Sequence, residues 1–141
     1  MDTNKNPAGI LEDVQVNVKI KLSGLWLAAL FCWIYGDLLR LYSGDYKPGD
    51  NLWGEMITSE MMWLVAAITM IVPGIMVFLS LALKSKANRW ANIIMGIFYT
   101  GYNLIGVSSY SSAYDIFLIL LSIVFTALVV WYAWKWPKQG A

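Results

Sequence analysis

Four long apolar stretches constrain this chain more than any motif does. They run over about residues 22–42, 59–83, 89–109 and 113–136. A helix needs about 20 residues to cross roughly 30 Å of hydrocarbon, and each stretch is long enough. Of all residues, 59% are hydrophobic and 13% are charged, whereas about a quarter are charged in a typical soluble domain. We therefore expect an all-α fold, a bundle of four transmembrane helices in contact with the lipid bilayer.

The polar segments between these stretches are short, which predicts how the helices pack. Short connections make consecutive helices antiparallel neighbours. We expect residues 1–21 to form a cytoplasmic or interfacial N-terminal segment, and residues 22–137 to form one four-span membrane domain. Pro73 lies inside the second stretch, and proline in a helix is a common cause of a kink.

Basic residues mark one end of the four stretches. Only Arg40 and Lys47 fall at the other end, and the remaining eight of the ten are Lys5, Lys19, Lys21, Lys84, Lys86, Arg89, Lys135 and Lys138. Basic residues near span ends are retained in the cytoplasm. We therefore expect both termini to be cytoplasmic (N-in/C-in) in a multi-pass protein of a plasma membrane.

Residues 14–22 alternate between apolar and polar side chains, from Val14 to Leu22. Strict alternation is typical of a β-strand, but a lone strand leaves its backbone groups unpaired. Two interpretations stay open. The segment is either an extended or helical lead-in to the first span, or a strand that pairs with another subunit.

Several classes of chemistry lack the residues they need. The chain has no histidine and one cysteine, Cys32, so we expect no histidine-dependent catalysis and no metal site of the Cys/His type. A net charge of +1 gives no reason to expect nucleic acid as a partner. We expect no metal and no cofactor, and no residue pattern supports an enzyme.

Small residues recur every fourth position along the first span, at Gly24, Ala28, Cys32 and Gly36. This spacing lets helix backbones approach closely in lipid. The stripe predicts either a contact between subunits of a homodimer or higher oligomer, or tight packing of the first span inside its own bundle.

Polar residues form a second stripe on the third span, at Asn88, Asn92, Gly96, Tyr99 and Asn103. At 100° per residue these positions lie within about 80° of one another on the helix. Polar side chains in lipid must find partners. The stripe therefore predicts either hydrogen bonds between helices or the lining of a wet crevice that crosses the membrane.

Acids and tyrosines gather at the end opposite the basic residues. Asp37 and Arg40 are three residues apart on one helix face, which places them within pairing reach. They form either an interfacial ion pair or part of a cavity that binds a small molecule or a cation, since acids and aromatic faces suit an organic cation. The candidate ligand-binding residues are Tyr35, Asp37, Arg40, Glu60, Asn92, Tyr99, Tyr102, Asn103 and Asp115.

Several sequence strings resemble a family of small bacterial four-span integral membrane proteins that is catalogued only as a domain of unknown function. The strings are VNVKIKLS from Val16, Tyr35-Gly36-Asp37, VFLSL from Val77, Asn88-Arg89-Trp90 and VWYAWKWP from Val130. The resemblance covers residues 11–137 and implies a bacterial inner-membrane protein. It implies no activity, cofactor or catalytic residue.

Our leading hypothesis is a binder or transporter of a small molecule, with a crevice that opens to the outside between spans one and three. The first alternative is a non-catalytic accessory or scaffold subunit, in which both stripes serve packing. The second alternative is a membrane enzyme that acts on a lipid, with a carboxylate as acid or base.

Overall fold

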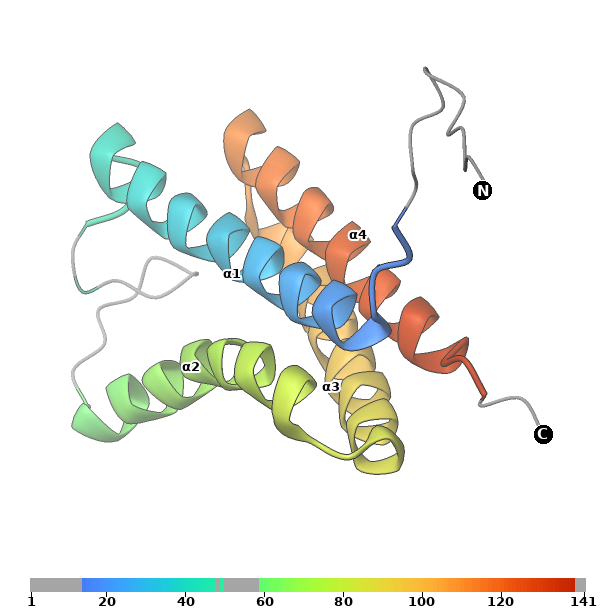
Figure 1. Cartoon of the computed structure of the whole chain (residues 1–141). Helices are drawn as coiled ribbons and strands as arrows, with labels where there is room; N and C mark the ends of the chain where they lie inside the picture. The colour runs from blue at the N-terminus through green and yellow to red at the C-terminus, as the bar shows by residue number, and fades with distance from the viewer. Residues whose placement is uncertain (1–13, 48, 50–58, 139–141) are drawn as a thin grey trace, which may run out of the picture.

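Four α-helices make up the computed structural model, which describes residues 14–47, 49 and 59–138. They are α1 (Val18–Ser43), α2 (Glu60–Ala82), α3 (Ser85–Gly106) and α4 (Ala113–Trp134), and a 3₁₀ turn, η1 (Val107–Ser109), follows α3 (Figure 1). The described residues contain no strand. The predicted all-α fold is therefore confirmed. Lys5 and the other residues up to 13 of the expected N-terminal segment lie outside the described part.

The alternating segment is helical from Val18 onward, so strand is the wrong interpretation for residues 18–22. Asn17 precedes the helix and accepts a hydrogen bond from the Lys19 backbone N–H at 2.9 Å, as an N-cap residue does. The Lys19 ammonium donates to the carbonyl of Leu83 at 2.7 Å and so caps the end of α2. Because both bonds favour the helix, α1 begins four residues before the predicted span.

The helices pack as a three-helix group with α2 on its flank. α4 lies along both α1 and α3, whereas α2 packs mainly on α1 and meets α3 at few places. The close approach of α3 and α4 depends on Gly96, because a Cβ there would lie 2.7 Å from the Val130 Cγ2 atom. The buried core contains Leu22, Trp26, Met76, Ile93, Tyr99, Val129 and Ala133.

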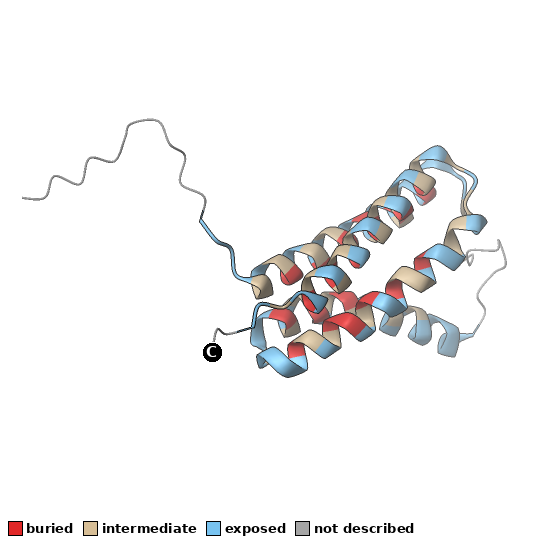
Figure 2. Cartoon of the chain, turned by 90° about the vertical axis from the view of Figure 1, so that its right-hand side faces the viewer, coloured by how far each residue is buried: buried red, intermediate tan, exposed pale blue. Residues whose placement is uncertain are grey.

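The outer surface of the helices is largely apolar, and buried positions face inward (Figure 2). Three helices, α1, α2 and α4, are long and apolar enough to cross a membrane. α3 is as long as α4, but basic and amide residues lower its hydropathy. The structure is thus consistent with a membrane protein, and three of the four helices in the described residues meet the requirement by length and composition.

Candidate functional site

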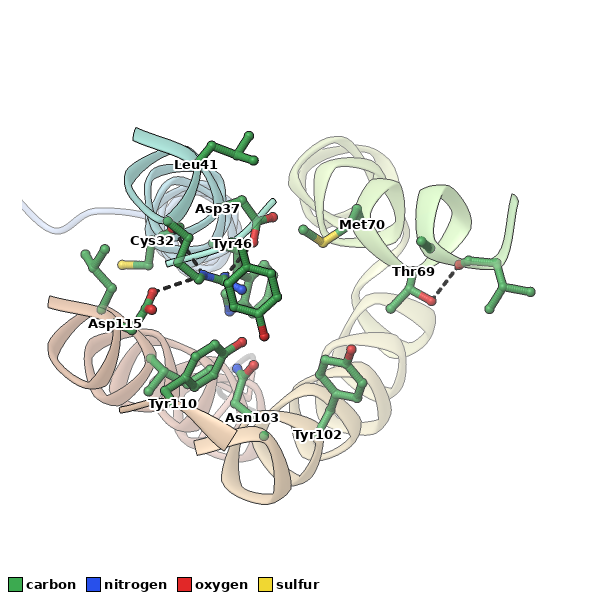
Figure 3. A pocket seen from close by; sticks show the side chains of 18 of the residues that line it. Cys32, Asp37, Leu41, Tyr46, Thr69, Met70, Tyr102, Asn103, Tyr110 and Asp115 are labelled. Carbon is green, nitrogen blue, oxygen red and sulfur yellow. Dashed lines mark hydrogen bonds and ion pairs between the residues drawn. The ribbon is translucent and has the colours of Figure 1, made fainter. Parts of the chain in front are cut away.

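A cavity of about 760 Å³ lies among all four helices, at the end where α1 and α3 finish and α2 and α4 begin (Figure 3). We call this end, which carries Asp37, Glu60 and Asp115, the acidic end, and the opposite end the basic end. The volume falls within the range of about 300–1,000 Å³ typical of small-molecule sites. Most of the wall is apolar or aromatic, and a few polar groups converge on it.

Arg40 holds two carboxylates together on the α1–α4 side of this pocket. Its Nη2 atom lies 2.5 Å from the Asp37 Oδ1 atom, and its Nε atom lies 3.1 Å from the Asp115 Oδ1 atom. The guanidinium also lies 5.4 Å from the ring centre of Tyr46 and 4.9 Å from that of Tyr110. The predicted Asp37–Arg40 pair is present. Asp115, which the sequence placed among the candidate ligand-binding residues, is a second partner of Arg40 that the sequence did not predict.

The three charges differ in how open they are to the pocket. The side chain of Asp37 is 45% exposed, whereas those of Arg40 and Asp115 are 10% and 6% exposed. A buried charge needs a partner because desolvation is costly, and the single guanidinium serves both acids. The accessible part of this cluster is therefore a carboxylate.

Part of the small-residue stripe packs inside the chain's own bundle, next to this charge cluster. A Cβ at Gly36 would lie 3.8 Å from the Asp115 Oδ1 atom and 3.9 Å from the Leu118 Cδ1 atom, both on α4. Cys32 is also buried. Gly24 is exposed, and no atom of the described residues beyond its own turn of helix lies within 4 Å of a Cβ built on it. The stripe thus serves the α1–α4 contact at the acidic end and is open at the basic end.

Tyr99 and Thr69 form the floor of the pocket, where α3 meets α2. The Tyr99 hydroxyl donates to the Thr69 carbonyl at 2.6 Å. That carbonyl would accept the N–H of the residue four positions later in an uninterrupted helix, but this residue is Pro73, which has no N–H. Tyr99 therefore satisfies the carbonyl that the proline leaves free.

Two buried donors on the pocket wall have no hydrogen-bond partner among the described residues. They are the Asn103 Nδ2 atom and the Trp33 Nε1 atom, and Asn103 as a whole is 2% exposed. Asn103 lies at the cavity between Tyr110 and Tyr102 (Figure 3). Buried polar atoms in native proteins are nearly always paired, so each of these two donors calls for an explanation.

The polar stripe of α3 divides into two parts with different roles. Toward the basic end, the Asn92 Oδ1 atom accepts bonds from Trp26 Nε1 at 2.7 Å and from Ser80 Oγ at 3.1 Å. Asn88 donates to the Ser80 carbonyl at 2.5 Å and accepts from Asn92 Nδ2 at 2.6 Å. We call this fully buried group the inner network. Asn92 therefore does not line the pocket, because its amide serves the inner network, whereas Tyr99 and Asn103 do line it.

The remaining candidates differ in whether they line the pocket. Tyr102 lines it. Tyr35 is 53% exposed and stacks on Phe31, and neither Tyr35 nor Glu60 is part of the wall. Wall residues outside the predicted set include Tyr46, Lys47, Met62, Trp63 and Tyr110. The excess of tyrosines at the acidic end of the predicted bundle was the signal that could have found Tyr46 and Tyr110.

A second polar group lies at the acidic end, between the start of the α1–α2 connection and the start of α4. Asp45 accepts hydrogen bonds from Ser112 at 2.6 Å and from the Tyr114 hydroxyl, which lies 2.8 Å from the Ser43 Oγ atom. We call Ser43, Asp45, Ser112 and Tyr114 the Asp45 clasp. These hydrogen bonds lower the pKa of Asp45 below its usual value, and the bond from Ser112 has the largest effect. Nearby, burial raises the pKa of the Tyr110 phenol.

The fold and the pocket together define a class, a small all-helical protein that is consistent with a membrane protein and has a largely apolar and aromatic pocket at one end of its helices. The chain belongs to a family of unknown function, DUF6326, whose family model matches residues 10–141. The resemblance to a family without known function is therefore confirmed. Comparison with curated proteins gives no match, and neither does comparison with solved structures.

Proposed function

We propose that this protein binds a small organic molecule or organic cation in the pocket at its acidic end. The observation that carries the proposal is the buried, unpaired amide of Asn103 on the wall of a cavity of about 760 Å³. An amide left unpaired in a buried site costs about 1–3 kcal/mol, and an acceptor oxygen on a ligand would remove that cost. Trp33 Nε1 supplies a second such donor, and Asp37 supplies an accessible charge.

The proposal includes a four-span bundle in which α3 also crosses the membrane. The three asparagines of α3 are buried, at 0%, 0% and 2% exposure for Asn88, Asn92 and Asn103. From Trp90 onward, the side chains that α3 exposes are all apolar or aromatic: Trp90, Ile94, Ile97, Phe98, Tyr102, Leu104 and Ile105. A helix with polar groups turned inward and apolar groups turned outward is suited to lipid, because its polar groups find partners inside the bundle.

The proposed orientation places both termini in the cytoplasm and the pocket on the outside of a bacterial inner membrane. Basic residues lie near the starts of α1 and α3 and the ends of α2 and α4, at Lys19, Lys21, Lys84, Lys86, Arg89 and Lys135. These positions share one end of an antiparallel bundle, and the bias of basic residues toward the cytoplasm supports the orientation.

Transport would need more than the pocket. The inner network and the core around Trp26 fill the bundle toward the basic end, so a ligand would cross only if these groups separated. Binding at the acidic end is the step that the geometry supports. A homodimer, one of the two interpretations of the small-residue stripe, would use the exposed part of the stripe near Gly24.

Native mass spectrometry of the protein released from nanodiscs made with bacterial lipid tests the proposal. We expect a defined small adduct on the wild type, a much weaker adduct on Asn103→Leu and Asp37→Asn, and an unchanged adduct on Tyr35→Phe, which alters no wall residue. Unfolding curves show whether each variant is folded. The same spectra report the number of subunits.

Two results would contradict the proposal. An adduct of equal strength on all four folded proteins would place the ligand elsewhere. A wild type that carries no small adduct but a stoichiometric protein partner would favour the accessory-subunit alternative.

A further inference from the structure

The contact between α2 and α3 is closed toward the basic end and open toward the acidic end. Three described hydrogen bonds join the two helices, and they involve Ser80 with Asn88, Ser80 with Asn92, and Thr69 with Tyr99. Between Thr69 and the acidic end, no hydrogen bond among the described residues joins α2 to α3. The pocket lies in this part of the bundle.

Residues of the pocket wall in this open part also lie on the flank of the bundle. Val65 and Met62 on α2 are 56% and 51% exposed, and Tyr102 on α3 is 48% exposed, although all three line the pocket. Figure 3 shows Met70 and Thr69 on α2 and Tyr102 on the neighbouring α3, around the same cavity. The pocket therefore opens sideways, between α2 and α3, as well as at the end of the bundle.

A proline-dependent bend accounts for this side opening. α2 is visibly curved (Figure 1) and contains Pro73, and proline bends a helix because it removes one backbone bond and crowds the preceding turn. Tyr99 holds α2 at the bend through the Thr69 carbonyl. On the acidic side of this point, α2 stands away from α3.

The depth of the opening places it beside hydrocarbon when the bundle spans a membrane. Thr69 lies nine residues from Glu60, the first residue of α2, which is about 14 Å along the axis at about 1.5 Å per residue. This is about half of a hydrocarbon layer of roughly 30 Å. The opening therefore faces the acyl chains of a single leaflet, and an occupant with an alkyl chain suits it.

The cluster of Asp37, Arg40 and Asp115 favours a cationic head group on that occupant, because it has two carboxylates and one guanidinium. Asp37 and Asp115 share the single guanidinium of Arg40, and Asp37 is the exposed member. Tyrosine rings, among them Tyr102 and Tyr110, line the same space, and aromatic faces attract cations. Lys47 lies exposed on the wall and is the one basic residue there besides Arg40 among the described residues.

We propose that the pocket takes a cationic amphiphile from the adjacent leaflet, with its head group at Asp37 and its chain in the side opening between α2 and α3. This inference rests on the proposed function and specifies its ligand class and route. It makes the protein a receptor for a membrane-dissolved molecule rather than for a water-soluble ion.

A matched series of probes tests the ligand class. The wild type in nanodiscs is incubated with dodecyltrimethylammonium, dodecyl maltoside or dodecyl sulfate, and with tetramethylammonium as the head group alone. Native mass spectrometry should show one saturable adduct of dodecyltrimethylammonium and weaker adducts of the other three. Asp37→Asn should weaken the cationic adduct about tenfold, since the Coulombic attraction between the carboxylate and the quaternary ammonium is lost.

A pair of tryptophan substitutions on α2 tests the side opening. Val65 lines the pocket and Ile68 does not, while both are more than half exposed. Val65→Trp should weaken or slow adduct formation about tenfold by narrowing the opening, and Ile68→Trp should leave it unchanged. Unfolding curves confirm that both variants fold.

The outcomes separate this inference from the proposed function. Equal adducts of the cationic, neutral and anionic amphiphiles overturn the cationic head group. Tetramethylammonium that binds as tightly as the amphiphile, with no effect of Val65→Trp, overturns side entry and leaves the pocket function in place. If no probe binds while the lipid-nanodisc experiment shows an adduct lost in Asn103→Leu, this inference falls and the proposed function stands.

Discussion

The bond between Tyr99 and the Thr69 carbonyl gives the sharpest test of how this structure is held together. Tyr99→Phe removes only the hydroxyl and keeps the ring contacts with Trp26 and Trp33 at 5.8 and 5.3 Å. The Thr69 carbonyl then loses its partner, because Pro73 provides no N–H. An unpaired buried group costs about 1–3 kcal/mol, and hydrogen bonds between membrane helices average about 0.6 kcal/mol with a maximum near 1.7. We expect Tyr99→Phe to lower the free energy of unfolding by about 1–1.5 kcal/mol.

A double-mutant cycle with Pro73→Ala isolates the cause. Alanine at position 73 provides the N–H that the Thr69 carbonyl lacks, so Tyr99→Phe should cost less than about 0.5 kcal/mol in that background. The interaction free energy should therefore be about 1 kcal/mol, within the range of about 0.5–3 kcal/mol for residues in direct contact. The assay is equilibrium unfolding in mixed micelles, by titration with dodecyl sulfate, followed by circular dichroism.

The same cycle can refute the role of the Tyr99 hydroxyl. If Tyr99→Phe costs the same with proline and with alanine at position 73, the hydroxyl does not replace the missing helix bond. Tyr99 would then act through its ring alone, and the account of the bend in α2 would be wrong.

Three further predictions concern packing, the inner network and pH. Gly96→Ala should lower the free energy of unfolding by about 1–3 kcal/mol, because the added methyl group overpacks against Val130. Gly101→Ala should have little effect, because no atom of the described residues beyond its own turn of helix lies within 4 Å of a Cβ there. The same titration in mixed micelles measures both variants. Asn92→Leu should lower the free energy of unfolding by about 1–3 kcal/mol because it leaves buried donors unpaired. Asn103→Leu should lower it less, because the Asn103 Nδ2 atom has no partner among the described residues. Equal losses in the two variants would contradict the division of the polar stripe into two parts. The Asp45 clasp lowers the pKa of Asp45, so it stabilises the fold above the unfolded pKa of about 4 and loses this effect as pH falls through the lower folded value. The difference in stability between the wild type and Asp45→Asn, measured at pH 7, 5 and 3, should therefore shrink at the acidic end of the series.

Much of the helical plan was predictable from local features of the sequence. The apolar stretches predicted four helices, and all four are present within a few residues of the predicted ranges. The spacing of Asp37 and Arg40 predicted their contact, since it depends only on helix geometry. For residues 18–22 the alternating pattern left two interpretations open, and the helical lead-in is the correct one. Alternation favours a strand only where a partner strand is available. The cap at Asn17 and the bonds of Lys19 favoured the helix instead.

The pocket needed the tertiary structure. Asp115 lies 75 residues from Arg40 in the sequence, and only the packing of α4 on α1 brings their side chains to 3.1 Å. The stripe on α3 was visible as one continuous pattern, but its division depends on which helix faces each part. Ser80 and Trp26 face Asn92, whereas the pocket faces Asn103.

The sequence alone determined which residues are apolar, which end of the bundle is acidic, and which side chains share a helix face. These follow from composition and from the 3.6-residue period, which act along a single helix. Only the tertiary structure decided that the described hydrogen bonds between α2 and α3 end at Thr69 and that one guanidinium serves two carboxylates. These depend on the rotation and bend of each helix against its neighbours, set by contacts between residues far apart in the chain.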